Sequence, residues 1–388
     1  MTAPSAQRRP RRILFGDVDA MYASAAVAQD PSLAGKPVAV GGPAPSGIIT
    51  AASYPARRFG VRSAMPTAQA LRLCPQLVVI PPDFALYRRL HDVMRDVVAQ
   101  SFPAVEWTSI DEFYADATDL QVLHPDSRAL GQAVKDAIFD GSGLRATVAV
   151  ATGKIVAKVA ADAHKPDGLV VVPPGSESAF LAPRPVSALP GIGPKTTAAL
   201  ERLGVRLIGD LLDPRFAPGL RQVWGARLAA IQAVARGEDH DPVVPDRTPK
   251  SIGHETTFDR ETDDLAVLEQ TLHGFLGELA HDLRLQGLAA GAFTVKLKDT
   301  RFTMTTRQRH FSSPLNYDPP MWQDIRNALR ELVKPGTRYR LAGIALSELA
   351  PTSESLFDHR TPKALAALDT LIEKHGAKVI RLGGLPER

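Results

Sequence analysis

Residues 12–19 read Arg-Ile-Leu-Phe-Gly-Asp-Val-Asp, an apolar run that ends in acidic residues. A short apolar run of this kind predicts a buried strand. Downstream, apolar periodicity predicts helices at about 86–101, 128–140 and 153–164, and strands at about 104–109, 112–116 and 145–151. With residues 20–82 set aside as an insertion, the element order is β-α-β-β-α-β. This order is the ferredoxin-like, split βαβ pattern.

The predicted topology brings acidic residues from distant parts of the chain together. In this fold the first and third strands are antiparallel neighbours in the middle of the sheet. The end of the first strand, with Asp17, therefore lies beside the start of the third, with Asp111 and Glu112. We expect these three carboxylates to meet at one place on the sheet, whereas Asp19 is expected to be structural and to point away from Asp17.

Three crowded carboxylates repel one another, and without a cation at least one would take up a proton. Two divalent cations would satisfy them, and Mg²⁺ prefers carboxylate, carbonyl and phosphate oxygens. Such a site is suited to phosphoryl or nucleotidyl transfer. The alternative is structural: Asp17 caps a turn, and Asp111 and Glu112 are acids of a hairpin. For any one of these acids taken alone, the structural alternative is favoured.

Composition sets the broad class. Of 388 residues, 44% are hydrophobic and 23% are charged, which excludes a fully disordered or collagen-like chain. Cys74 is the single cysteine, so an internal disulfide framework and a cysteine-based zinc site are excluded. The basic start of the chain is not followed by the apolar region of a signal peptide. No segment approaches the roughly 18 apolar residues of a membrane-spanning helix. The net charge of +4 does not by itself establish a nucleic-acid partner.

Further boundaries follow from local composition. Residues 173–185 are rich in Pro, Ser and Ala, and a compact helical stretch at 186–240 opens with Leu-Pro-Gly-Ile-Gly-Pro-Lys. Residues 241–251 carry three prolines and little apolar content, which is typical of a linker. Residues 252–350 are predicted to form a last α/β unit, with helices near 263–286 and 319–333 and strands near 291–299, 301–311 and 338–349. Within this unit, 284–310 carries six basic residues against one acid.

Five motifs together resemble one family, the Y-family translesion DNA polymerases, with the DNA polymerase IV (DinB) branch most similar. The motifs are GDVDAMY (16–22), YPARRFGVRSAMP (54–66), SIDEFYAD (109–116), KIVAKVAADAHKPDG (154–168) and LPGIGPKT (189–196). They fall in the family's order and spacing across about 12–350. The resemblance implies a multidomain α+β fold shaped like a right hand: a ferredoxin-like palm, small fingers, a helical thumb with a helix-hairpin-helix, and an α/β little finger.

The implied domains are a basic arm (1–11), a palm (12–19 and 83–172), fingers (20–82), a thumb (173–240), a linker (241–250), a little finger (251–350) and a tail with a short helix (351–388). The implied activity is template-directed addition of deoxynucleotides to a primer, with low fidelity and past damaged bases. The implied partners are primer-template DNA and a deoxynucleoside triphosphate. A monomer is expected, without a membrane, in the bacterial cytoplasm and associated with the nucleoid.

The resemblance also assigns metal ligands. It implies two Mg²⁺ ions, with Mn²⁺ as a substitute. Asp17 and Asp111 would bridge both ions, Glu112 would bind the ion nearer the primer 3′-hydroxyl, and the carbonyl of Val18 would bind the nucleotide-side ion.

Nucleotide contacts are implied for Tyr54, Arg57 and Lys165, which would hold the triphosphate, since arginine is a planar bidentate donor for phosphate. Tyr22 occupies the family's steric-gate position beneath the sugar, where a ring would exclude a 2′-hydroxyl. The structural alternatives are a solvated helix face for Arg57 and a core aromatic for Tyr22. Ala51-Ala52-Ser53 stands where the family commonly has Thr-Ala-Asn, so the usual threonine contact is not carried over.

DNA contacts are implied in two places. In the helix-hairpin-helix turn, Gly191, Gly193 and Lys195 would let backbone N–H groups approach a phosphate. In the linker and little finger, the implied contacts are Lys250, Ser251, Arg307 and Arg309. The structural alternatives are a plain Gly-Pro loop and a solvated sheet face.

A further implied partner is the bacterial sliding clamp, bound through a degenerate motif that keeps Leu356 and Phe357 but lacks the usual glutamine. Two other function classes stay open. A catalytically inactive, DNA-binding Y-family scaffold is disfavoured because Asp17, Asp111 and Glu112 are all present. A nucleotidyl cyclase would share a similar palm and metal site, and the helix-hairpin-helix turn and basic last domain disfavour it.

Overall fold

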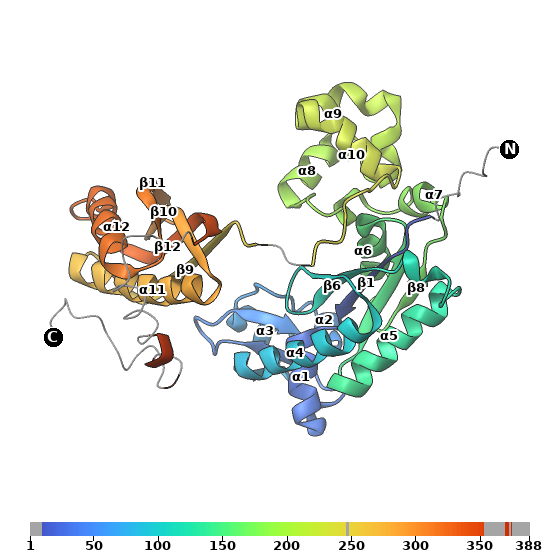
Figure 1. Cartoon of the computed structure of the whole chain (residues 1–388), viewed down its shortest axis with the longest axis horizontal. Coiled ribbons are helices and arrows are strands. Elements are labelled where there is room, and N and C mark those ends of the chain that lie inside the picture. The colour runs from blue at the N-terminus through green and yellow to red at the C-terminus, as the bar shows by residue number, and fades with distance from the viewer. Residues whose placement is uncertain (1–9, 246–247, 353–368, 372–373, 375–388) are drawn as a thin grey trace. The chain divides into compact units, whose positions relative to one another are not determined.

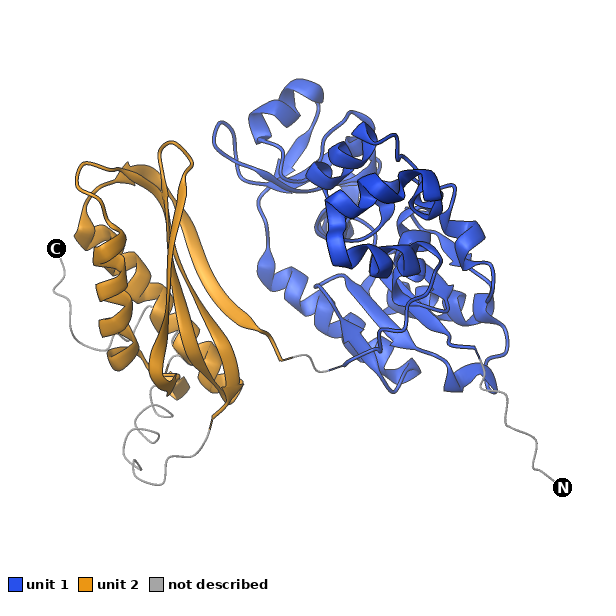
Figure 2. Ribbon diagram, turned by 90° about the horizontal axis from the view of Figure 1, so that it is seen from above, with its two compact units in different colours: residues 1–247 blue, residues 248–388 orange. Residues whose placement is uncertain are grey.

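The computed structural model describes residues 10–245, 248–352, 369–371 and 374. The chain divides into two compact units, residues 1–247 and 248–388, which are coloured separately in Figure 2.

The first unit is built on a five-stranded sheet with the strand order β5-β6-β1-β7-β8. Its strands are β1 (Ile13–Val18), β5 (Val105–Trp107), β6 (Glu112–Asp116), β7 (Ala146–Ala151) and β8 (Leu169–Val171). Strand β1 pairs antiparallel with both β6 and β7. The predicted ferredoxin-like arrangement is therefore confirmed. Strand β8, which pairs parallel to β7, was not predicted, because a three-residue apolar run carries little periodicity.

Helices cover both faces of this sheet (Figure 1). They are α4 (Phe84–Ser101), α5 (Ser127–Ser142) and α6 (Lys154–Asp162). Residues of α4 and α5 share one apolar core with Leu14 and Val18 of β1, whereas α6 shares another core with Ile13 and Phe15. Every residue of β1 is buried for this reason, and a strand buried on both faces reads as a continuous apolar run.

The core on the α6 side continues into a helical region. Its helices are α7 (Glu177–Leu181), α8 (Pro194–Arg202), α9 (Ala217–Trp224) and α10 (Leu228–Ala235). Leu181, Leu200 and Leu220 from these helices belong to the same cluster as Val156 of α6. The predicted helical stretch therefore packs against the five-stranded sheet and α6, and shares their apolar core.

The insertion after β1 divides in two. Helix α1 (Met21–Gln29) contributes Met21 and Ala25 to the core of the sheet. The rest forms a small body with its own core around Ile49 and Cys74. This body consists of the sheet β3-β2-β4 with strands β2 (Val38–Gly41), β3 (Ile49–Ala52) and β4 (Val78–Ile80), and of helices α2 (Tyr54–Arg58) and α3 (Thr67–Leu73).

The second unit is a four-stranded antiparallel sheet, β11-β10-β12-β9, with two helices packed on one face (Figure 2). Its elements are β9 (Ser251–Thr262), α11 (Leu265–Leu285), β10 (Leu288–Asp299), β11 (Met304–Leu315), α12 (Asp318–Leu332) and β12 (Tyr339–Pro351). Both helices and the three later strands were predicted. Strand β9 was not, because it lies at the sheet edge and its side chains are exposed or only half-buried.

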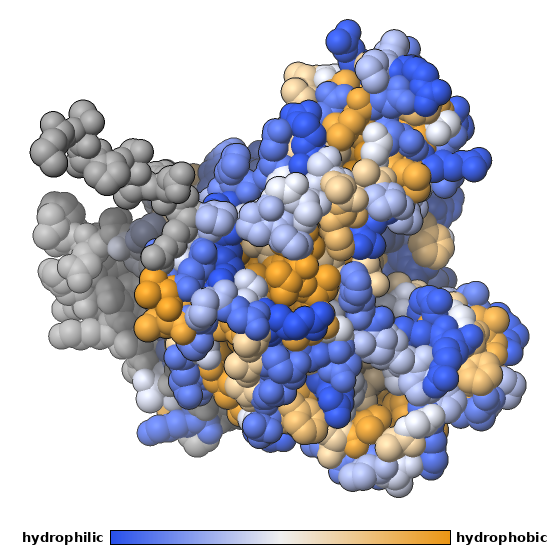
Figure 3. Space-filling view, turned by 90° about the vertical axis from the view of Figure 1, so that its right-hand side faces the viewer, coloured by the Kyte–Doolittle hydropathy of each residue, from blue (hydrophilic) through white to orange (hydrophobic). Residues whose placement is uncertain are grey.

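Within the described part of the chain, no helix is long and apolar enough to cross a membrane. On the face drawn in Figure 3, hydrophilic residues predominate and apolar residues form separate small groups. The mixed pattern is typical of a solvated surface.

A buried ion pair joins the sheet to α6. The ammonium of Lys154 contacts the carboxylate of Glu106 on β5, and their side chains are 10% and 5% exposed. The same carboxylate accepts a hydrogen bond from the Val244 N–H at 2.9 Å. At the next residue of α6, the Ile155 N–H donates to the Asp239 carboxylate at 2.7 Å. The chain that follows α10 is thereby fastened to the sheet.

We expect Lys154→Ala to lower the free energy of unfolding of the first unit by about 3–5 kcal/mol, because it leaves the buried Glu106 carboxylate without this cation. Urea unfolding followed by circular dichroism measures the change. Arg215→Ala is the matched control, since its partner Asp213 forms an exposed pair. A Lys154→Ala protein as stable as the control would contradict this account.

Candidate functional site

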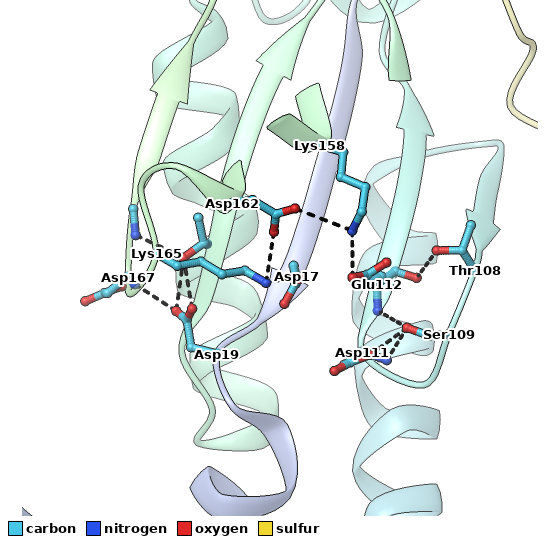
Figure 4. A network of polar contacts seen from close by, with 12 residues as sticks. Asp17, Asp19, Thr108, Ser109, Asp111, Glu112, Lys158, Asp162, Lys165 and Asp167 are labelled. Atoms are coloured by element: carbon cyan, nitrogen blue, oxygen red, sulfur yellow. Dashed lines mark hydrogen bonds and ion pairs between the residues drawn. The ribbon is translucent and has the colours of Figure 1, made fainter. Parts of the chain in front are cut away.

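The three predicted carboxylates meet where β1 ends. Asp17 lies directly opposite Glu112 in the antiparallel register of β1 and β6. The N–H of Val18 donates to the carbonyl of Asp111 at 3.0 Å. Figure 4 shows Asp17 on one strand and Asp111 and Glu112 at the start of its neighbour. The sequence-predicted convergence of these residues is therefore present in the structure.

Asp17 is almost fully buried, at 3% exposed. The ammonium of Lys165 contacts its carboxylate and lies 3.3 Å from Asp162. Burial raises the pKa of Asp17 to about 7, against the opposing pull of the Lys165 charge. Burial alone would lower the pKa of Lys165, but the Asp17 carboxylate outweighs it and holds that pKa above its ordinary value. Both groups therefore depend on each other for charge compensation.

Glu112 forms an ion pair with a second lysine. The ammonium of Lys158 on α6 lies 2.8 Å from its carboxylate. Burial would raise the pKa of Glu112, but the hydrogen bond and charge of Lys158 outweigh it, and the pKa lies below its ordinary value. Sequence reasoning missed Lys158. A signal was available, because Lys154 and Lys158 stand four residues apart on a largely apolar helix, and buried ammonium groups need carboxylate partners.

The carboxylate of Asp111 is hydrogen-bonded to a neighbouring serine. The hydroxyl of Ser109 donates to its carboxylate at 2.5 Å and accepts the Glu112 N–H at 3.0 Å. Across the described residues, no three acidic, histidine or cysteine side chains are placed to hold one metal ion. The donor set itself, three carboxylates beside a backbone carbonyl, consists of the hard oxygens that Mg²⁺ prefers. The chemistry of the residues therefore fits the metal, while lysines neutralise two of the carboxylates.

Tyr54 and Arg57 lie together at the start of α2. Ser53 caps the helix and accepts the Ala56 N–H at 3.4 Å. The Arg57 guanidinium carbon lies 4.6 Å from the centre of the Tyr54 ring, and its Nε donates to the Ala52 carbonyl at 2.9 Å. Arg58, the next residue, is exposed.

Tyr22 of α1 lies in an aromatic cluster. Its half-buried ring stacks on Tyr87 of α4, with centroids 4.1 Å apart and an angle of 16° between the ring planes. Phe84 meets both rings edge-on. The sequence did not single out Tyr87 or Phe84, because aromatics at helical spacing are ordinary core residues.

The predicted glycine-rich turn precedes α8. Gly191 has a positive φ of 88°, and Gly193 is the residue before the first helical position. Both glycines and Lys195 are exposed. A Cβ added at either glycine would meet no atom within 4 Å, so the backbone at this helix N-terminus is open to an approaching group. Lys250 and Ser251 are exposed at the start of β9.

Basic side chains on the strands of the second unit already pair with acidic residues of the same unit. Arg307 and Arg309 share one face of β11, and both pair with Glu331 of α12 at 3.6 and 2.6 Å. Arg284, the first basic residue of the 284–310 stretch, lies on α11, where its guanidinium is 11% exposed and pairs with Asp369 at 2.6 Å.

Three family models match the chain. The model described as the impB/mucB/samB family matches residues 16–162, its C-terminal domain matches 249–358, and the IMS family HHH motif matches 174–205. Together they cover more than half of the sequence.

The chain belongs to the Y-family of DNA polymerases, in the DNA polymerase IV branch. It is 40% identical to the DNA polymerase IV of Halorhodospira halophila over 88% of this chain and 96% of that protein. The corresponding protein of Gluconobacter oxydans is 36% identical over 87% of this chain and 94% of the relative. The chain is accordingly a DNA-directed DNA polymerase of the translesion class.

Solved structures agree on the fold. A Y-family DNA polymerase chimera has a TM-score of 0.79 at 24% identity, over 88% of this chain and 100% of that one. DinB from Sulfolobus solfataricus has a TM-score of 0.63 over the same shares. The predicted Y-family polymerase fold is confirmed, with mixed α+β sheets, a helix-hairpin-helix motif and a C-terminal antiparallel sheet.

Substitution of Tyr22 tests whether its stacked ring is the predicted steric gate. Tyr22→Ala should raise ribonucleotide incorporation, relative to deoxynucleotide incorporation, by about tenfold or more, because the ring that excludes the 2′-hydroxyl is gone. Single-nucleotide extension kinetics measure the ratio. Tyr87→Phe, which keeps a ring beneath Tyr22, is the control. Unchanged selectivity in Tyr22→Ala would reject the assignment.

Proposed function

We propose that the polymerase site of this chain is a two-metal site formed by Asp17, Asp111, Glu112 and the carbonyl of Val18. The observation that supports it most is the position of Asp17 directly opposite Glu112, with Asp111 next to it. Divalent-metal catalysis belongs to the family; two Mg²⁺ ions, with Mn²⁺ as a substitute, are the specific proposal. When bound, the ions lower the pKa of the attacking hydroxyl and stabilise charge on the phosphate being transferred.

The chain's own cations complete the site. Arg57 offers a planar fork to the triphosphate, and Lys165 offers a point charge from the palm side. Lys165 contacts Asp17 in this structure, so binding a triphosphate requires its ammonium to exchange one anion for another. The Arg57 guanidinium lies against the face of the Tyr54 ring. The Tyr22 ring is proposed to lie beneath the sugar of the incoming nucleotide.

Primer-template DNA is the proposed macromolecular substrate, with a deoxynucleoside triphosphate as the second one. The open backbone at Gly191 and Gly193, with Lys195 beside it, suits a DNA phosphate without reading sequence. Lys250 and Ser251 are exposed and are proposed to contact DNA as well. Arg307 and Arg309 would have to share their charge between Glu331 and DNA.

We further propose that the domain boundaries implied by the family resemblance hold and that the protein is a monomer. We also propose that it acts at the nucleoid in the bacterial cytoplasm.

Primer extension with Asp111→Ala tests the proposed site. The rate should fall by about a thousandfold or more, because several kcal/mol of charge stabilisation is lost. Chelation of divalent ions should also stop extension, and Mg²⁺ or Mn²⁺ should restore it. Asp116→Asn, at the other end of β6 where the carboxylate binds the Thr118 N–H, is the matched control.

The same assay separates the alternatives. A wild-type protein that binds DNA but shows no metal-dependent extension would be the inactive scaffold. Cyclic nucleotide made from ATP or GTP would indicate the cyclase.

The clamp motif at Leu356 and Phe357 lies outside the described residues and stays a prediction. We expect Leu356→Ala/Phe357→Ala to abolish retention of the chain on immobilised sliding clamp, because the two apolar anchors of the motif are removed. Ser355→Ala is the matched control. Equal retention of the double variant and the wild-type chain would reject clamp binding through this segment.

A further inference from the structure

Lys135 is a nearly buried cation on α5, away from the proposed metal ligands. It lies among the buried residues of that helix, with Gly131, Val134 and Ile138, so it stands on the helix face that packs against the sheet. Its side chain is only 10% exposed. An ammonium in such a place is costly unless each of its protons finds an acceptor.

The acceptors come from the loop after α6. The Lys135 ammonium donates to the Asp167 and Gly168 carbonyls at 2.5 and 3.1 Å, and lies 2.9 Å from the Asp167 carboxylate. Three protons thus meet three acceptors on two consecutive residues. The same carboxylate also pairs with Arg145 at 3.1 Å. Lys135 therefore ties this loop to α5.

The loop folds back tightly between His164 and Gly168. A Cβ added at Gly168 would lie 2.3 Å from the His164 carbonyl oxygen, so the backbone comes closer there than any other residue would allow. Asp167, just before this glycine, has a positive φ of 55°. Residues 164–168 therefore form a compact turn, and Lys165 lies within it.

Two buried groups at the end of the sheet hold the backbone N–H groups of this turn. The Asp167 N–H donates to the Asp19 carboxylate at 2.7 Å, and the Gly168 N–H donates to the Thr147 hydroxyl at 3.2 Å. Asp19 is 4% exposed and also accepts from the Tyr54 and Thr147 hydroxyls. The turn is thus held both by α5 and by the end of the sheet.

Lys165 extends from the turn toward the carboxylates of the site. Its ammonium contacts Asp17 and lies 3.3 Å from Asp162. Figure 4 shows the Lys165 side chain running toward Asp17, while the Asp167 side chain points away from it. To bind a phosphate, the ammonium must leave these carboxylates, but the backbone that carries it can stay in place. An ordered backbone spares the entropy cost of ordering it when the substrate binds.

We propose that Lys135 is a positioning residue for nucleotide binding: it holds the turn at 164–168 so that Lys165 reaches the triphosphate from a fixed backbone. The inference rests on the proposed role of Lys165 in binding the triphosphate. It adds to that role a residue of a different element, α5, which acts through the backbone of the turn.

The test measures kcat and the KM for the correct deoxynucleotide in single-nucleotide extension by the full chain on primer-template DNA. Lys135→Met keeps a long side chain without the donors and should raise KM by about tenfold, with a smaller change in kcat. Lys135→Arg keeps donors for both carbonyls and should stay within about twofold of the wild-type KM. In a Lys165→Ala background, Lys135→Met should raise KM by less than about twofold, because the side chain that the turn positions is gone.

Arg12→Met is the matched control. Arg12 is also a nearly buried cation, 8% exposed, and it donates to two consecutive backbone carbonyls, those of His124 and Pro125, at 2.5 and 3.0 Å. Its loss should lower the melting temperature and leave KM unchanged, because the loop that it holds carries no proposed nucleotide contact. A rise in KM of the same size in both variants would overturn the proposal.

Two further outcomes would also overturn it. One is a Lys135→Met protein with a lower melting temperature and an unchanged KM, and the other is a KM effect that persists undiminished in the Lys165→Ala background. If Lys135→Met does not fold, Asp167→Asn takes its place, since it removes the carboxylate partner of Lys135 and keeps a residue type that tolerates a positive φ. Asp167→Asn should raise KM by about threefold, and an unchanged KM would reject the role.

The Lys165→Ala variant keeps this inference separate from the proposed nucleotide site. If Lys165→Ala leaves KM unchanged, the proposed triphosphate contact is wrong, and the inference falls with it. If Lys165→Ala raises KM while Lys135→Met does not, the role of Lys165 stands and only that of Lys135 is rejected.

Discussion

A carboxylate at the end of a doubly buried strand is the constraint on which the first unit depends. Burial of β1 on both faces takes Asp17 out of water, and an isolated charge there would be costly. Glu112 lies opposite it, which adds like charge. The structure compensates with cations from the helix and loop that follow β7: Lys158 on Glu112 and Lys165 on Asp17. The position of α6 against the sheet is therefore an electrostatic requirement as well as a packing one.

The proposed two-metal site would change the role of Lys165. If divalent ions supplied the positive charge at Asp17, the Lys165 ammonium would be free to move to a phosphate oxygen. Such an exchange would keep the local charge balanced. Asp19 stands outside it, since its three hydrogen-bond donors leave it a structural anchor between the insertion and the sheet.

The sequence predicted much of the fold, because apolar periodicity and element order are local properties. The order of the predicted elements between residues 12 and 151 was enough to predict the ferredoxin-like sheet, and with it the meeting of Asp17 with Glu112. The strands β8 and β9 were missed for opposite reasons: one is too short to show a period, and the other is an edge strand with exposed side chains. Asp19 was expected to point away from Asp17, but alternation along a strand does not give that result, because residues two apart in a strand share a face. In the structure Asp19 lies beyond the end of β1, and its carboxylate binds Tyr54, Thr147 and the Asp167 N–H.

By itself, the sequence determined the family, the order of the elements and the identity of the three acids, because these follow from residue types and their spacing along the chain. Only the tertiary structure decided which partner each charge has. Lys158 on Glu112, Arg284 on Asp369, Arg309 on Glu331 and Tyr54 on Asp19 all join residues from separate elements. A charge in a protein is satisfied by whatever the fold brings within about 3 Å of it, and that distance is not encoded in any local pattern.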